Sequence, residues 1–143
     1  MDAKSDPDAQ PWSVIFQVNT SEPKIVGVDI KGVTVVGRAE PDDKEQPDFD
    51  LTPYGAFSHG VSRRHAILMP TAQGLTLIDL GSTNGTWLNG RNLKHGQRYR
   101  IRTGDYIEFG TLRMDVRLVG AVSTGGDSTT TMVTRDRPRR DDE

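Results

Sequence analysis

The chain has 143 residues, enough for one domain with tails, and its formal net charge of −2 points to neither a nucleic-acid nor a membrane partner. It contains no cysteine, which excludes disulfides, thiolate catalysis and cysteine metal sites. Its three histidines are scattered, and no apolar run approaches the roughly 20 residues that span a bilayer. The N-terminus is polar and acidic and does not resemble a signal peptide, so we expect a soluble cytoplasmic protein without metal or cofactor.

Both ends of the chain are poor in apolar residues. Residues 1–11 combine prolines with aspartates, and residues 120–143 are rich in glycine, threonine and charged side chains. Such segments cannot bury enough apolar surface to offset the entropy that ordering would cost. The sequence therefore predicts disordered tails at 1–11 and 120–143 around one folded domain at 12–119.

Within this domain helical periodicity is absent and alternation with a period of two dominates. Strands are expected, in chain order, at 14–18, 26–30, 33–35, 65–69, 75–80, 86–88, 99–101, 106–109 and 112–119. Asn89-Gly90 predicts a two-residue hairpin, because both residues tolerate a positive φ. Many short strands at regular spacing favour an antiparallel sandwich or barrel with polar outer faces.

Charge is distributed unevenly along the chain. Residues 39–50 carry six acids and one base, net −5, whereas residues 51–119 carry nine bases and four acids, net +5. The basic centre could attract an anionic ligand and the acidic stretch could repel one, or both could be solvated faces without a partner.

Two loops and one strand end concentrate polar side chains, at Gly60–His65, Gly81–Thr86 and Gly37-Arg38. The strands on either side of the expected turn near 71–74 run in opposite directions. Ser62 and the second loop should therefore lie at the same end of the sheet. The irregular stretch 39–60 leaves open the end at which Arg38 lies.

The side chains in these loops are hydrogen-bond donors without a general base. Ser62 and Thr83 provide hydroxyls, and Arg38, Arg63 and Arg64 provide guanidinium groups. This combination suits an oxyanion such as a phosphate ester, which carries about −1.5 to −2 charges and three strong acceptor oxygens. The Asn84 amide is suited to bonding the backbone N–H and C=O of a ligand. No phosphate-binding P-loop, catalytic triad or carboxylate pair is present, so an enzyme is not expected.

Short motifs follow one another along the chain in this order: Gly37-Arg38, Ser62-Arg63-Arg64-His65-Ala66, Asp79–Thr86, Leu88-Asn89-Gly90, Gly104-Asp105 and Phe109-Gly110. Together they resemble a forkhead-associated (FHA) domain over residues 12–119. The resemblance implies an all-β, eleven-stranded antiparallel two-sheet sandwich of the FHA/SMAD-like class. It also implies that loops at one end of the sandwich bind phosphothreonine.

The resemblance implies two sets of functional residues. The phosphopeptide-binding set is Arg38, Ser62, Arg63, Thr83 and Asn84, and the supporting set is Gly37, His65, Gly81 and Gly85. In the first set Arg38 and Ser62 match phosphate ligands, and Thr83 matches a loop residue in contact with the phosphothreonine. Asn84 matches the residue that fixes the peptide backbone, and His65 matches a buried histidine that braces the loops.

One stretch departs from the family pattern. Residues 39–60 are longer than the usual connection between the arginine and serine motifs, with a short strand expected at Asp48–Leu51. The segments 40–47 and 53–60 are then the extended parts. The second precedes Ser62, and we expect it to form one wall of the peptide groove.

These features imply an adaptor, not an enzyme, that binds phosphothreonine-containing proteins in Ser/Thr kinase signalling. A phosphothreonine protein or peptide and a Ser/Thr protein kinase are the expected partners. Three alternatives stay open: a phospho-independent scaffold that uses a sheet face, a regulator that binds metabolic enzymes directly, and nucleic-acid binding through the basic centre.

The C-terminal tail contains a run of threonines, Thr129, Thr130 and Thr131. A kinase could phosphorylate them, and the product would be a ligand for this chain's own groove or for a second copy. A tethered ligand reaches effective concentrations of the order of millimolar. The alternative is a plain polar linker.

Overall fold

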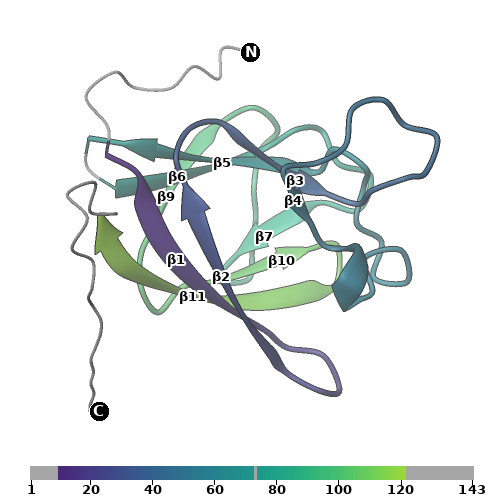
Figure 1. The fold of residues 1–143 in the computed structure, drawn as a ribbon, viewed down its shortest axis with the longest axis horizontal. Helices are drawn as coiled ribbons and strands as arrows, with labels where there is room; N and C mark the ends of the chain where they lie inside the picture. Colours follow the sequence, from purple (N-terminus) through teal and green to yellow (C-terminus); the bar gives the residue numbers. More distant parts are fainter. Residues whose placement is uncertain (1–9, 73, 122–143) are drawn as a thin grey trace.

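Two β-sheets face each other in the computed structural model, which describes residues 10–72 and 74–121 (Figure 1). The larger sheet contains, in spatial order, β2 (Lys24–Ile30), β1 (Trp12–Val18), β11 (Leu112–Ala121), β10 (Tyr106–Phe109), β7 (Thr86–Leu88) and β8 (Arg91–Asn92). The smaller sheet contains β4 (Phe49–Asp50), β3 (Thr34–Gly37), β5 (Ala66–Thr71), β6 (Gly74–Asp79) and β9 (Arg98–Ile101). The predicted eleven-stranded two-sheet sandwich is therefore confirmed. Among the described strands, the pairing of β3 with β4 is parallel and the others are antiparallel.

The core lies between the two sheets and follows from the alternation in the sequence. In β1 the side chains of Val14, Phe16 and Val18 are fully buried. The Phe16 ring stacks on the ring of Phe49 from β4, with 5.5 Å between the centroids, and so joins the two layers. Burying each side chain of this size stabilises the fold by about 1.5–3 kcal/mol, which is why period-two alternation determines the architecture.

A second apolar cluster lies on the opposite face of the smaller sheet. Its members are Val35, Ile67, Met69 and Ile78, and Leu80 packs against them. In β5 and β6 both alternating sets of side chains are buried, so these central strands have two apolar faces. The expectation of polar outer faces is therefore wrong for the centre of this sheet.

Several strand boundaries differ from those expected. The hairpin at Asn89-Gly90 is confirmed, with φ of 53° and 84°, but it leads into β8, which the alternation pattern did not predict. Strand β11 continues to Ala121 and pairs there with Trp12, two residues beyond the boundary expected at 119. Gly120 and Ala121 are therefore part of a strand and not of a tail. Residues 1–9 and 122–143 lie outside the described residues.

The order of strands in the smaller sheet determines where the polar loops meet. Strand β5 lies between β3 and β6 and is antiparallel to both, with Val36, Ala66 and Asp79 in register. The end of β3, the start of β5 and the end of β6 therefore lie at one edge of the sheet. This arrangement places Arg38, which follows β3, at the same end as Ser62 and the 81–86 loop.

Candidate functional site

Backbone contacts hold Arg38 against the loop before β5. The Arg38 N–H lies 3.2 Å from the carbonyl oxygens of both Ser62 and Arg63. Gly37 is buried directly beside this contact, and a Cβ atom at that position would overlap the Arg63 carbonyl oxygen. The absence of a side chain at Gly37 thus lets β3 and the serine loop approach closely.

The Arg38 side chain is only 17% exposed and is oriented by three contacts. Its Nε–H donates to the carbonyl of Val61 at 3.0 Å, and its Nη1 forms an ion pair with Glu40. The guanidinium carbon lies over the Phe57 ring, 5.1 Å from the centroid. The guanidinium is thus held in a fixed orientation.

Hydrogen bonds join the serine loop to the 81–86 loop. The Thr83 N–H donates to Ser62 Oγ at 3.2 Å, and Asn84 Nδ2 donates to the carbonyl of Gly60 at 3.0 Å. These contacts confirm the expectation that the two loops are neighbours. They also show that the Asn84 amide bridges the loops through one of its donors.

His65 connects the two loops from inside the fold. It is fully buried, its Nδ1 accepts from the Ser62 N–H at 2.9 Å, and its Nε2 lies 2.9 Å from the Gly85 carbonyl. Because Nδ1 accepts, the ring proton is on Nε2, which donates to Gly85. Burial lowers the pKa of His65 below its ordinary value of 6.5, although the Gly85 carbonyl and the Asp79 charge oppose this shift. The neutral imidazole fits this role as a brace.

Asp79, at the end of β6, organises the 81–86 loop, a role that was not predicted from the sequence. Its carboxylate accepts from the Gly81 and Ser82 N–H groups at 2.8 and 3.2 Å, and from the Ser82 and Thr86 hydroxyls, both at 2.6 Å. Burial alone would raise the pKa of Asp79, but the hydrogen bonds outweigh it and hold the pKa below 3.8. The signal in the sequence was an aspartate two residues before the glycine of a turn, because aspartate bonds to backbone N–H groups at that spacing.

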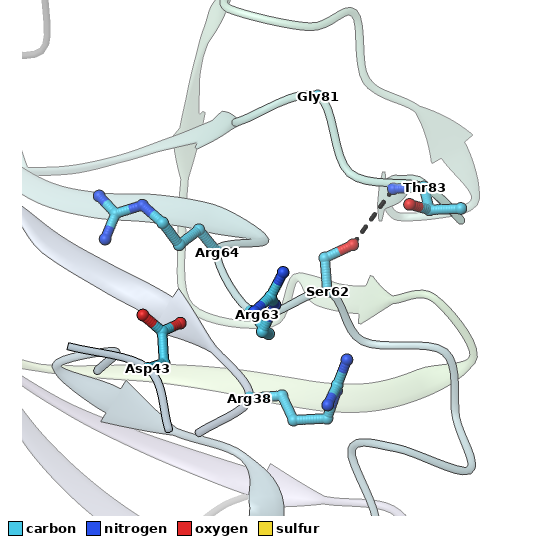
Figure 2. A pocket seen from close by; sticks show the side chains of 7 residues that line it. All are labelled: Arg38, Asp43, Ser62, Arg63, Arg64, Gly81 and Thr83. Carbon is cyan, nitrogen blue, oxygen red and sulfur yellow. Dashed lines mark hydrogen bonds between the residues drawn. The ribbon is translucent and has the colours of Figure 1, made fainter. Parts of the chain in front are cut away.

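An open cavity of about 570 Å³ lies where the three segments meet (Figure 2). It is lined by Arg38, Asp43, Ser62, Arg63, Arg64, Gly81 and Thr83. The lining carries three guanidinium groups and one carboxylate, and this excess of positive charge favours an anion. Two of the guanidinium groups also form ion pairs with carboxylates beside the cavity, Arg38 with Glu40 and Arg64 with Glu45. Arg64 extends away from Ser62 and Thr83 and forms an ion pair with Glu45 at 3.5 Å.

The sequence-based site residues are not all in this cavity. Asn84 and Gly85 lie on the other side of the 81–86 loop, beside a second open cavity of about 530 Å³ that Lys94 and His95 also line. Gly81, by contrast, lines both cavities with a φ of 80° that favours glycine. The 81–86 loop therefore separates the two cavities. The anion-favouring cavity lies on one side of it, and Asn84 lies on the other.

An acidic segment borders the anion cavity. This position of the segment was not predicted from the sequence. Asp43 lines the cavity and Glu40 pairs with Arg38. Gln46 holds this segment, because its Nε2 donates to the carbonyls of Glu40 and Asp43 at 2.7 and 2.6 Å. These bonds fix the shape of the 40–46 segment, and the ion pair between Glu40 and Arg38 joins the segment to the cavity.

The ranges 10–72 and 74–121 contain no group of three or more potential metal-ligating side chains. No helix within these ranges is long and apolar enough to cross a membrane.

Comparison with known proteins identifies a family for the central part of the chain. The FHA domain model matches residues 34–110. Protein FraH of Nostoc sp. is 38% identical over 78 residues, which are 54% of this chain and 27% of FraH. The E3 ubiquitin-protein ligase RNF8 of Rattus norvegicus is 43% identical over 51 residues, 35% of this chain and 10% of the ligase. This chain thus spans only a small part of either relative.

Solved structures share both the fold and part of the sequence. A chain from a study of phosphothreonine-dependent FHA domain interactions is 30% identical, with a TM-score of 0.56 over 73% of this chain and 95% of that chain. The FhaA FHA domain, solved in complex with the intracellular domain of Rv3910, is 29% identical, with a TM-score of 0.55 over 73% of this chain and 99% of that chain. The family match at residues 34–110 covers more than half of the chain, and the sandwich agrees with it, so this protein belongs to the forkhead-associated (FHA) family.

Proposed function

We propose that this chain is a phosphothreonine-peptide-binding adaptor in Ser/Thr kinase signalling. The main support is the convergence of Arg38, Ser62 and Thr83, from three separate segments, on one anion-favouring cavity. A phosphate ester supplies the dianionic charge and the three acceptor oxygens that such donors match. The relatives solved with a protein partner or in a phosphothreonine-dependent context support the same class of ligand.

Each residue of the proposed site has a bonding group left for a ligand. Arg38 uses Nε and Nη1 within the protein, and a guanidinium has five N–H donors in total. Ser62 Oγ accepts from Thr83, so its own hydroxyl proton is free to donate to a phosphate oxygen. The Asn84 amide oxygen can accept from a peptide N–H. Arg63 lines the cavity and adds a second positive charge.

Calorimetry with one peptide in three forms tests this function. The phosphothreonine form is expected to bind well, because family resemblance implies that the pocket senses the threonine methyl group. The phosphoserine and unphosphorylated forms are expected to bind weakly or not at all. Equal binding of all three forms would reject the proposal.

Arg38→Ala tests the central contact. Removing one partner of a desolvated charge pair costs roughly 2–5 kcal/mol of binding, and the fold should persist because Arg38 follows a strand end. Arg117→Ala, which removes an exposed arginine from β11, is the matched control and should bind like the wild type. If Arg38→Ala still captures the partner with full affinity, a phospho-independent scaffold is the better interpretation.

The threonine run Thr129–Thr131 lies outside the described residues, and its role as a regulatory ligand is part of the same proposal. Phosphorylation of one of these residues would place a phosphothreonine within the reach of the cavity of the same chain or of another copy. Occupancy by the tail would then weaken the binding of an external phosphopeptide.

Kinase treatment of the wild type and of a Thr129/Thr130/Thr131→Ala variant tests the tail. We expect the treated wild type to bind an external phosphopeptide more weakly than the treated variant. Dilution separates the two modes, because occupancy in trans depends on protein concentration and occupancy in cis does not. Equal affinities of the treated wild type and variant would reject self-regulation.

A further inference from the structure

Phe57 is an exposed aromatic residue beside Arg38, which lines the anion cavity. The large apolar side chains exposed among the described residues are Ile25, Val33, Phe57 and Val119. Phe57 is the most exposed of these at 78%, and its ring contacts the guanidinium of Arg38, which lines the cavity. Isolated exposed apolar residues are common, so exposure alone does not indicate a function for Phe57. Its contact with an arginine of the proposed site is the feature to explain.

The exposure of Phe57 follows from a backbone that is hydrogen-bonded on both sides. The Gly55 N–H donates to the Thr52 carbonyl at 3.1 Å, and the Gly60 N–H donates to the Phe57 carbonyl at 3.2 Å. The neighbouring Ala56 is fully buried, and its carbonyl accepts from the Val61 N–H at 2.9 Å. The backbone is thus anchored on both sides of Phe57, which fixes the point from which its side chain projects.

One surface of the ring is used within the protein. The guanidinium carbon of Arg38 lies 5.1 Å from the ring centroid, a distance at which the positive charge is attracted to the π face. The rest of the ring faces solvent. Phe57 therefore restrains Arg38 on one side and presents an apolar surface to solvent on the other.

We infer that Phe57 contacts one residue that flanks the phosphothreonine and selects an apolar side chain there. The inference rests on the proposed function, because a phosphate held by Arg38 brings the adjacent peptide residues to the ring. An extended peptide advances about 3.3–3.6 Å per residue, so the ring lies within one or two residues of the phosphothreonine.

The charges around the ring favour an apolar ligand side chain over a charged one. A lysine or arginine of the ligand would meet the like charge of Arg38, which already lies over the ring. An aspartate or glutamate would meet the carboxylate of Glu40, which is paired with the same guanidinium. A leucine, methionine or aromatic side chain covers the ring without either repulsion.

Fluorescence anisotropy with the full 143-residue chain tests this selection. Labelled phosphothreonine peptides carry leucine, serine, lysine or aspartate at one flanking position at a time. For the wild type we expect leucine to bind about fivefold more tightly than serine at one of these positions, which corresponds to partial burial of one aromatic ring. In Phe57→Ser this preference should fall below about twofold.

Two further variants make the comparison specific. Phe57→Leu keeps an apolar side chain and should retain the preference for leucine in the peptide. Ile25→Ser removes another exposed apolar residue, from β2, and should leave the selectivity of the wild type unchanged.

Three results would overturn the inference. If the wild type shows no apolar preference at any flanking position, the inference is overturned. The proposed function stands in that case as long as binding still depends on the phosphate. A Phe57→Ser variant that loses affinity equally for all peptides shows that the ring only positions Arg38. A wild type that ignores phosphorylation altogether removes both the proposed function and this inference.

Discussion

The Arg38 guanidinium is paired with the carboxylate of Glu40, two residues further along the chain. The two side chains are 17% and 37% exposed, so the ion pair forms at the border between the protein and the cavity. A phosphate that binds Arg38 through Nη1 has to displace this carboxylate or lie beside it. Glu40 is therefore an internal competitor of the proposed ligand.

Glu40→Gln is expected to tighten phosphothreonine-peptide binding by up to about fivefold, because partly exposed ion pairs contribute about 0.2–1 kcal/mol. The gain should diminish at high salt, which screens the competing charge. Calorimetry at two salt concentrations measures both effects. Glu22→Gln, an exposed site before β2, is the control and should change neither. Weaker binding by Glu40→Gln would mean that the carboxylate orients Arg38 instead of competing for it.

Gly37→Ala is expected to lower the free energy of unfolding by about 1–3 kcal/mol, because its Cβ would overlap the Arg63 carbonyl. Phosphopeptide affinity should fall as well, since the serine loop has to shift. Gly27→Ala in β2 is the matched control, because a Cβ there meets nothing within 4 Å. It should leave binding unchanged and stabilise the fold slightly. Urea titration and anisotropy measure the two quantities, and equal stability of the two variants would contradict the close contact.

The strands, and the proximity of the 60–65 and 81–86 loops, could be predicted from the sequence because both follow from local periodicity. The alternation in β1 and the Asn89-Gly90 turn determine their own geometry, and an antiparallel return places Ser62 beside Thr83. Arg38 could not be placed in the same way. Its position depends on the spatial order of β3, β5 and β6, which is a tertiary property.

The details of the site that sequence patterns did not predict come from side-chain contacts in irregular segments of the chain. Glu40 and Asp43 belong to a segment whose net charge and extra length were noted but whose position was not predicted. The Gln46 hydrogen bonds that shape this segment have no periodic signal. The apolar outer cluster of the smaller sheet was missed because both faces of β6 are buried, which removes the alternation between polar and apolar residues.

His65 makes the stability of the domain depend on pH. Burial lowers its pKa in the folded state, so below about pH 6.5 the unfolded chain takes up a proton that the folded chain does not. The free energy of unfolding should therefore fall as the pH decreases through 6.5, by at most about 1.4 kcal/mol per pH unit for one proton. Urea midpoints between pH 7.5 and about 5 measure this effect.

A His59→Gln/His95→Gln variant isolates this effect, because it leaves His65 as the only histidine of the chain. The variant should keep a decline in stability over the same pH range. A urea midpoint that does not change with pH in this variant would contradict the buried, neutral state of His65.

Asp79→Asn tests whether one carboxylate holds the 81–86 loop in its binding shape. In asparagine an NH2 group replaces either Oδ2, which accepts from the Gly81 and Ser82 N–H groups, or Oδ1, which accepts from the Ser82 and Thr86 hydroxyls. In either orientation N–H donors would face one of these two pairs of donors. Leaving such buried groups without partners costs roughly 1–3 kcal/mol of unfolding free energy. Because Thr83 lies in the same loop, phosphopeptide affinity should fall together with stability.

Asp29→Asn, at an exposed position of β2, is the matched control and should alter neither quantity. The carboxylate also has its own pH signature. Its pKa in the folded state lies below 3.8, so its stabilising contribution is fully present near neutral pH and is lost as the pH falls below 3.8 through the folded-state pKa of Asp79. Loss of stability in Asp79→Asn without loss of affinity would show that the loop keeps its shape by other contacts, such as the Ser62–Thr83 hydrogen bond.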